Sequence, residues 1–194
     1  HEVLRDLYTP PGAPGSGEAG DAALPLRERI AAAWERRGAA LAARVRAHYP
    51  GLWDLVTAQW IAAIEEFVRL DAAAIASAVE PPRPEHPAEA AIPLGGGADD
   101  LRLRGRFDRL TPYRDRLVVS DYKTSGRPAH HVEAAPILKG QRLQMPLYVL
   151  LAEQSSVGAA RPFVRAEVLG VGPDFAGADA AERTAALDPG RFDH

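Results

Sequence analysis

The chain has 194 residues, of which 46% are hydrophobic and 25% are charged, and this composition suits one globular domain. Cysteine is absent, which excludes disulfides, thiolate zinc sites, cysteine-ligated iron–sulfur clusters and a cysteine nucleophile, and fits a cytoplasmic protein. The formal net charge of -3 disfavours binding of nucleic acid through the overall field, and no apolar run is long enough to predict a membrane helix.

The first eighty residues predict a helical region. Residues 1–8 carry apolar side chains at helical spacing, whereas residues 9–21 are rich in proline and glycine and predict a flexible loop. Alanine, leucine, glutamate and arginine dominate residues 24–79, which predicts two or three helices with the main break at Pro50. Since the chain starts at His1 without an initiator methionine, we expect it to be a segment of a longer protein.

The remainder, residues 81–194, predicts a small sheet covered by helices. A run of prolines at its start ends the helical part, and a helix is expected over residues 135–154, with Pro146 implying a kink or a start nearer Leu143. The predicted fold class is α/β, a small central mixed sheet flanked by helices, with residues 1–80 as the N-terminal helical region of one combined domain. Strands are expected at residues 89–94, 101–110, 117–122 and 163–171, the second and third forming an antiparallel hairpin.

The hairpin carries charged residues where its strands leave the core. Successive side chains of a strand point to opposite faces, so Asp121 and Lys123 of "VVSDYKTSG" share a face, with Asp108 of "GRFDRL" in reach on the neighbouring strand. Two carboxylates at one point repel each other unless a cation lies between them. A Mg²⁺ ion, which prefers oxygen ligands, meets this need, and Lys123 would orient the attacking water or stabilise developing charge.

Basic residues gather around this hairpin. Between residues 102 and 127, arginine and lysine outnumber aspartate. The arginines of the first hairpin strand are Arg102, Arg104, Arg106 and Arg109. A solvated hairpin would explain this charge.

Three motifs in order, "GRFDRL", "VVSDYKTSG" and "GQRLQMPLY", resemble the PD-(D/E)XK nuclease superfamily and, within it, the RecB-like branch with its RecB- and AddB-type nuclease domains. In that branch a Gly-x-x-Asp-Arg strand, an Asp-Tyr-Lys-Thr strand and a Gln-x-x-x-Tyr helix follow one another at about these separations. The resemblance covers residues 89–153 and implies a restriction-endonuclease-like core. AddB-like members often carry an iron–sulfur cluster on cysteines, and we expect none here.

The resemblance assigns roles to residues of the three motifs. It implies that Asp108 and Asp121 bind Mg²⁺, or Mn²⁺ in its place, and that the carbonyl of Tyr122 adds a third oxygen. It also implies a catalytic lysine on the second strand and a glutamine and a tyrosine on one helical face that reach the active site. The implied catalytic residues are Asp108, Asp121, Lys123, Gln144 and Tyr148. The implied nucleic-acid contacts are Arg102, Arg104, Arg106, Arg109 and Gln141.

The branch also has a histidine on a helix before the sheet, where it completes the metal site. "HEVLRDLY" has this His-x-x-Leu pattern, which makes His1 the candidate metal ligand and His48 the reserve, while His130 and His131 fall in an expected loop. An acid is often found on the strand before the hairpin in this branch. Glu89 fits that position, and a solvated strand residue would look the same.

The predicted function is that of a Mg²⁺-dependent deoxyribonuclease, an exonuclease on single-stranded DNA ends. The resemblance implies that a helicase in the same polypeptide or complex delivers these ends during double-strand break repair and recombination. The alternative is a catalytically inactive nuclease-like module with a structural or DNA-binding role. A third interpretation, a helical interaction domain with an incidental hairpin, requires the three ordered motifs to be a coincidence.

Overall fold

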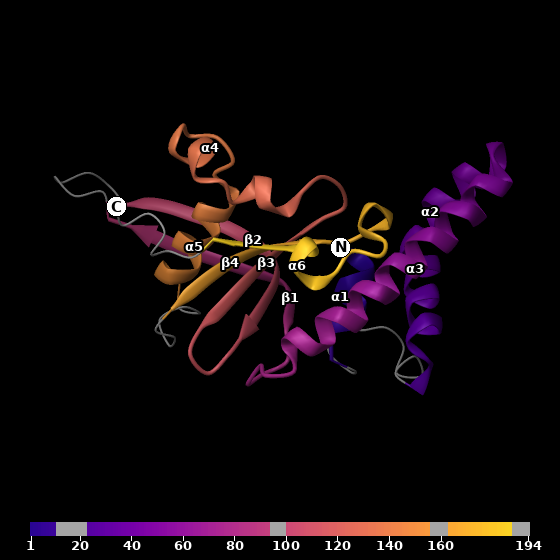
Figure 1. The fold of residues 1–194 in the computed structure, drawn as a ribbon, viewed down its shortest axis with the longest axis horizontal. Coiled ribbons are helices and arrows are strands. Elements are labelled where there is room, and N and C mark those ends of the chain that lie inside the picture. The colour runs from indigo at the N-terminus through magenta and orange to yellow at the C-terminus, as the bar shows by residue number, and fades with distance from the viewer. Residues whose placement is uncertain (11–22, 94–99, 156–162, 188–194) are drawn as a thin grey trace.

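A computed structural model describes the chain in four stretches. The loop predicted at residues 9–21 lies, from residue 11 onwards, outside them. Figure 1 shows two long helices on one side of the molecule and a twisted sheet on the other. The described residues are 1–10, 23–93, 100–155 and 163–187.

The N-terminal part is helical, as predicted. It consists of α1 (Glu2–Tyr8), α2 (Leu26–His48) and α3 (Pro50–Ile75). The last two run antiparallel, because Trp34 of α2 stacks on Trp60 of α3 at 5.9 Å and Arg27, near the start of α2, pairs with Glu65 of α3 at 3.0 Å. Pro50 occupies the first turn of α3, where its missing N–H needs no partner, so the predicted break is confirmed.

The sheet has five strands in the order β1-β2-β3-β4-β5. β3 and β4 are parallel and the other neighbouring pairs are antiparallel, which confirms a mixed sheet and the predicted hairpin of β2 and β3. The strands are β1 (Arg83–Ile92), β2 (Leu101–Pro112), β3 (Leu117–Lys123), β4 (Val164–Gly170) and β5 (Thr184–Leu187).

The sheet differs from the prediction at both of its edges. β1 begins at Arg83, six residues before the predicted start at Glu89, and contains Pro84 and Pro87. Proline cannot donate to a strand ladder, but β1 is an edge strand whose outer side has no neighbour in the sheet, and there proline is tolerated. The other edge, β5, was not predicted, because its four residues, mostly alanine, show no strand pattern.

The predicted helix over residues 135–154 is two helices. α4 (Ala134–Leu138) is short, and α5 (Gln144–Gln154) starts next to Leu143, so Pro146 lies in its first turn and breaks no hydrogen bond. With the 3₁₀ helix η2 (Pro128–His131), they form the crossover between the parallel strands β3 and β4. α5 packs closely on β2, because a Cβ at Gly105 would lie 2.8 Å from the side chain of Leu151.

Each face of the sheet has its own apolar core. On one face, Phe107, Leu110 and Val119 pack with residues of α5. On the other, Tyr122 and Leu169 pack with residues of α1, α2 and α3. The short elements η3 (Pro173–Phe175) and α6 (Ala180–Arg183) lead into β5. None of the helices in the described stretches combines the length and the apolar character that crossing a membrane requires.

Candidate active site

Asp108 and Asp121 lie opposite each other where the β2–β3 hairpin opens. The last pair of its ladder is Arg109 with Ser120, which places these aspartates on adjacent strands just beyond it. There a side-chain oxygen replaces a backbone carbonyl as the acceptor between the strands, because Asp108 Oδ2 accepts a hydrogen bond of 2.8 Å from the backbone N–H of Tyr122. The side chain of Asp108 is therefore fixed by the neighbouring strand.

Around Asp108 the fold gathers two further side chains with metal-ligand chemistry. His1 places its Nδ1 3.2 Å from Asp108 Oδ2. Glu85 of β1 joins them, and one ligand atom from each of the three residues lies within 4.8 Å of the others. This group joins the residue before α1 to the strands β1 and β2, which are far from it in the sequence.

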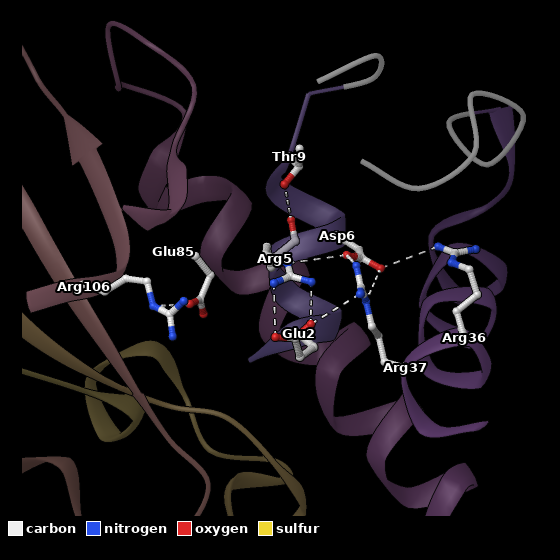
Figure 2. A network of polar contacts seen from close by, with 8 residues as sticks. All are labelled: Glu2, Arg5, Asp6, Thr9, Arg36, Arg37, Glu85 and Arg106. Carbon is white, nitrogen blue, oxygen red and sulfur yellow. Dashed lines mark hydrogen bonds and ion pairs between the residues drawn. The ribbon is translucent and has the colours of Figure 1, made fainter. Parts of the chain in front are cut away.

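Glu85 is the residue that sequence reasoning missed. The ladder between β1 and β2 pairs Pro84 with Arg109 and His86 with Phe107, so Glu85 stands across from Asp108. Its backbone has a left-handed φ of 50°, a conformation that a non-glycine residue adopts only when its surroundings impose it. Its carboxylate also forms an ion pair with Arg106, whose Nε lies 2.9 Å away (Figure 2). The two flanking prolines hid it, because they argued against a strand there.

Glu89, the acid suggested from the sequence, lies elsewhere. It pairs in register with Arg104 on β2, and the two side chains form an ion pair of 3.0 Å with both members largely exposed. An acid on the first strand does reach the site, but it is the one four residues earlier.

A second polar group links β3 to α5. Lys123 Nζ lies 2.7 Å from Asp121 Oδ2 and donates to Gln144 Oε1 at 3.1 Å. Gln144 in turn donates from Nε2 to Asp121 Oδ1 at 2.7 Å and to Tyr148 Oη at 3.2 Å. Tyr148 donates to the backbone carbonyl of Arg106 at 3.1 Å. The structure thus brings Asp121 and Lys123 of the second motif together with Gln144 and Tyr148 of the third.

The electrostatics indicate an excess of negative charge between these groups. The hydrogen bond that His1 donates to Asp108 raises the pKa of His1 above its ordinary value, and the charges of Asp121 and Glu85 add to the increase, whereas partial burial opposes it. Burial raises the pKa of the Asp121 carboxyl, and Asp108 adds to that increase, whereas Lys123 opposes it. Carboxylates that disfavour one another's ionisation are an environment in which a bound cation is stabilised.

The donor set fits a hard divalent ion. Carboxylate oxygens and one imidazole suit Mg²⁺ or Mn²⁺, which keep several waters among their ligands. Tyr122 turns its ring away into the apolar core, 4% exposed, and meets the His1 ring edge-on at 5.8 Å. The ring of Tyr122 therefore offers no metal ligand. A metal bond from its backbone carbonyl stays a prediction.

The arginines of β2 divide into two kinds. The side chains of Arg102, Arg104 and Arg106 are exposed. Arg109 is 2% exposed and pairs with Asp71 at 2.5 Å, so its predicted contact with nucleic acid is wrong. Its side chain points beneath the sheet, where Asp71 of α3 and the Tyr8 ring of α1 enclose the guanidinium.

Gln141 does not lie in a helix, although the predicted helix over residues 135–154 includes it. It is exposed and precedes α5, in the turn after α4, where its N–H donates to the carbonyl of Pro136 at 2.8 Å. The reserve histidine His48 ends α2, at the turn of the helical hairpin. His130 pairs with Glu133 at 3.7 Å, outside the group around Asp108.

Comparison with known proteins places the chain in a family. A model of the PD-(D/E)XK nuclease superfamily matches residues 1–191. No curated protein gives a significant match. Among solved structures, the chain is similar to the crystal structure of SSO0001, with 17% identity, coverage of 75% of this chain and 60% of that chain, and a TM-score of 0.32. That similarity is too distant to support any argument. Since the family model spans nearly the whole sequence, the chain belongs to the PD-(D/E)XK nuclease superfamily.

Proposed function

We propose that this protein is a divalent-metal-dependent deoxyribonuclease that hydrolyses phosphodiester bonds as an exonuclease on single-stranded DNA ends. The observation that carries the proposal is the meeting of Asp108, Asp121 and Lys123 at one end of the β2–β3 hairpin. Two carboxylates and an ammonium at one opening are the groups that metal-assisted phosphoryl transfer requires. Membership of a nuclease superfamily supports nucleic acid as the substrate.

The metal site would be formed by His1, Glu85, Asp108 and Asp121, with the backbone carbonyl of Tyr122 as a further oxygen. Mg²⁺ is the ion proposed, with Mn²⁺ as a substitute, since neither needs a sulfur ligand and the chain has no cysteine. When bound, such an ion polarises the phosphoryl group and makes nearby water more acidic.

Lys123 is proposed as the catalytic lysine. Its side chain is 27% exposed, so it is open to substrate while its ammonium contacts Asp121 and Gln144. From there it can orient the attacking water and stabilise the charge that develops on the phosphate. Tyr148 keeps Gln144 in place through its hydroxyl, which is itself tied to the backbone of β2.

The DNA strand is proposed to run along β2. Arg102, Arg104 and Arg106 are exposed at successive alternate positions and lead towards Asp108, the direction in which a phosphate backbone would approach the metal site. Gln141, exposed before α5, is a further proposed contact. The motif resemblance supports a RecB-like exonuclease that acts with a helicase in DNA repair and recombination, and a cytoplasmic location stays a prediction.

The test uses end-labelled single-stranded DNA. The protein is incubated with Mg²⁺, with Mn²⁺ and with EDTA, beside Asp121→Ala and Lys123→Ala variants whose folding is checked by circular dichroism. We expect release of labelled nucleotides with either metal, none with EDTA, and none from either variant. Binding of DNA by the unmodified protein without any cleavage would instead support the inactive nuclease-like module.

A further inference from the structure

We propose that Tyr8, Asp71 and Arg109 are positioning residues that hold His1 at the metal site. The proposal rests on the metal site proposed above. It assigns a role to a buried polar cluster beneath the sheet, on the side opposite to Lys123 and Gln144. Its members come from α1, α3 and β2, and none of them contributes to the group around Asp108.

His1 depends on α1 for its position. It immediately precedes α1, and its side chain is 42% exposed, with Asp108 and the edge of the Tyr122 ring as its contacts on the sheet side. Beside it lies an apolar cavity of about 60 Å³, lined by residues that include Trp34 and Trp60. Dense packing therefore does not enclose the imidazole, and a small shift of α1 would move its Nδ1 away from Asp108.

The far end of α1 is fastened to the buried cluster. Tyr8, the last residue of the helix, donates its hydroxyl hydrogen bond to Asp71 of α3. The same carboxylate oxygen of Asp71 accepts from Arg109 at 2.5 Å, and the guanidinium also lies 5.3 Å from the centre of the Tyr8 ring. Tyr8 is thus held by a hydrogen bond and by a cation–π contact at once.

Arg109 connects this anchor to the catalytic strands. It follows Asp108 directly on β2, and its guanidinium lies 5.7 Å from the centre of the Tyr122 ring on β3. Its second partner, Glu167 of β4, accepts from Arg109 at 3.5 Å and from Ser120 at 2.7 Å. The buried guanidinium therefore sets the spacing between α1 and the two strands that carry Asp108 and Asp121.

A separate set of contacts holds α1 against α2 (Figure 2). Asp6 is buried and pairs with Arg37 through two hydrogen bonds, and it also lies 3.8 Å from Arg36. These contacts bind α1 to another helix and leave its distance from β2 undetermined. The Tyr8 cluster is the polar link, among the described side chains, that runs from the body of α1 to the strand of Asp108.

The key variant is Tyr8→Phe, which removes one hydroxyl and leaves the pair of Asp71 and Arg109 intact. Tyr113→Phe is the matched control, because the Tyr113 hydroxyl also bonds to α3, at the carbonyl of Ala74, but touches neither α1 nor His1. Both variants lose one hydrogen bond to the same helix. A purely structural role predicts the same behaviour for the two.

The measurement is the affinity for Mn²⁺ without DNA, by isothermal titration calorimetry, together with the melting temperature. We expect both variants to lose a few degrees of melting temperature, whereas Tyr8→Phe alone raises the Kd for Mn²⁺ by about five-fold, the effect of one lost hydrogen bond. Equal Mn²⁺ affinity for Tyr8→Phe and the unmodified protein would overturn the positioning role. If Tyr8→Phe does not fold, Asp71→Asn, which keeps the shape of the acceptor, takes its place in the same comparison.

A double-variant cycle identifies the route of the effect. In a His1→Ala background, Tyr8→Phe should leave the Kd for Mn²⁺ unchanged, because the ligand that it positions is gone. A five-fold loss that persists in that background would show that Tyr8 acts by another route. If the unmodified protein binds no Mn²⁺, the proposed metal site itself fails, an outcome distinct from Mn²⁺ binding that is insensitive to Tyr8.

Discussion

Two ion pairs lie on opposite faces of the sheet, and they differ chiefly in their exposure to solvent. Lys123 with Asp121 is 27% and 3% exposed, whereas Arg109 with Asp71 is 2% and 4% exposed. The first cation remains open to a substrate, and the second is enclosed by two tyrosine rings. An ion pair on one face of the sheet is therefore available for catalysis, whereas the ion pair on the other face stabilises the fold.

Replacing the open cation should affect catalysis much more than folding. For Lys123→Ala we expect kcat/KM on single-stranded DNA to fall on the order of 10³-fold, since stabilisation of developing charge is lost. The free energy of unfolding should fall by only about 1–2 kcal/mol, because Asp121 keeps its hydrogen bond from Gln144. Steady-state kinetics and urea denaturation measure the two effects. Nuclease activity close to that of the unmodified protein would contradict the assignment of Lys123.

Replacing Arg109, the enclosed cation, should instead cause a large loss of stability. Arg109→Met leaves the carboxylates of Asp71 and Glu167 without their buried partner, and we expect the free energy of unfolding to fall by about 3–5 kcal/mol. Urea denaturation measures the loss. In the control, Arg109→Met combined with Asp71→Asn, part of the loss should be recovered because one stranded charge is removed. If Arg109→Met lowers the free energy of unfolding by less than about 1 kcal/mol, the buried ion pair does not stabilise the fold in this way.

The glutamine between the strands and α5 should have an intermediate effect. Gln144→Leu preserves the size of the side chain but removes an acceptor from Lys123 and a donor from Asp121. We expect kcat to fall by about 10- to 100-fold, as for other residues that orient a metal site. Gln154→Leu, at the other end of α5, is the matched control and should retain the kcat of the unmodified protein. Equal rates for both variants would remove Gln144 from the site.

The smallest effect should come from the exposed arginines. Arg102→Ala should reduce the slope of log affinity against log salt by about 1, the contribution of one phosphate contact. Fluorescence anisotropy with labelled single-stranded DNA at several salt concentrations measures the slope. Arg69→Ala, on α3, removes the same charge and should leave it unchanged. Equal slopes for the two variants would argue against β2 as the DNA-binding strand.

The site was predictable where it depends on local spacing. Asp121 and Lys123 share a face of one strand, and Gln144 and Tyr148 are one helical turn apart, so alternation and helical periodicity were sufficient to group them. The hairpin followed from two strand patterns around a short turn. The same alternation also places Arg109 on the opposite face from Asp108, a consequence that the row of neighbouring arginines obscured.

Glu85 shows what local reasoning could not reach. Its flanking prolines are compatible with a strand only at the edge of a sheet, and position in a sheet is a property of the assembled fold. The strand β5 was not predicted for a related reason. A segment of four residues becomes a strand by pairing with β4 and not by its own preference.

The amino-acid sequence by itself determined the family-like order of the motifs, the helical and strand-forming segments, and the residues that face the same way within each segment. Tertiary structure decided which segments meet: it brought His1 and Glu85 to Asp108 and placed Arg109 beneath the sheet. The physical reason is that periodicity acts over a few residues, whereas burial and charge pairing depend on elements distant in the chain. Exposure, which separates the open cation from the enclosed one, exists only once those elements have packed.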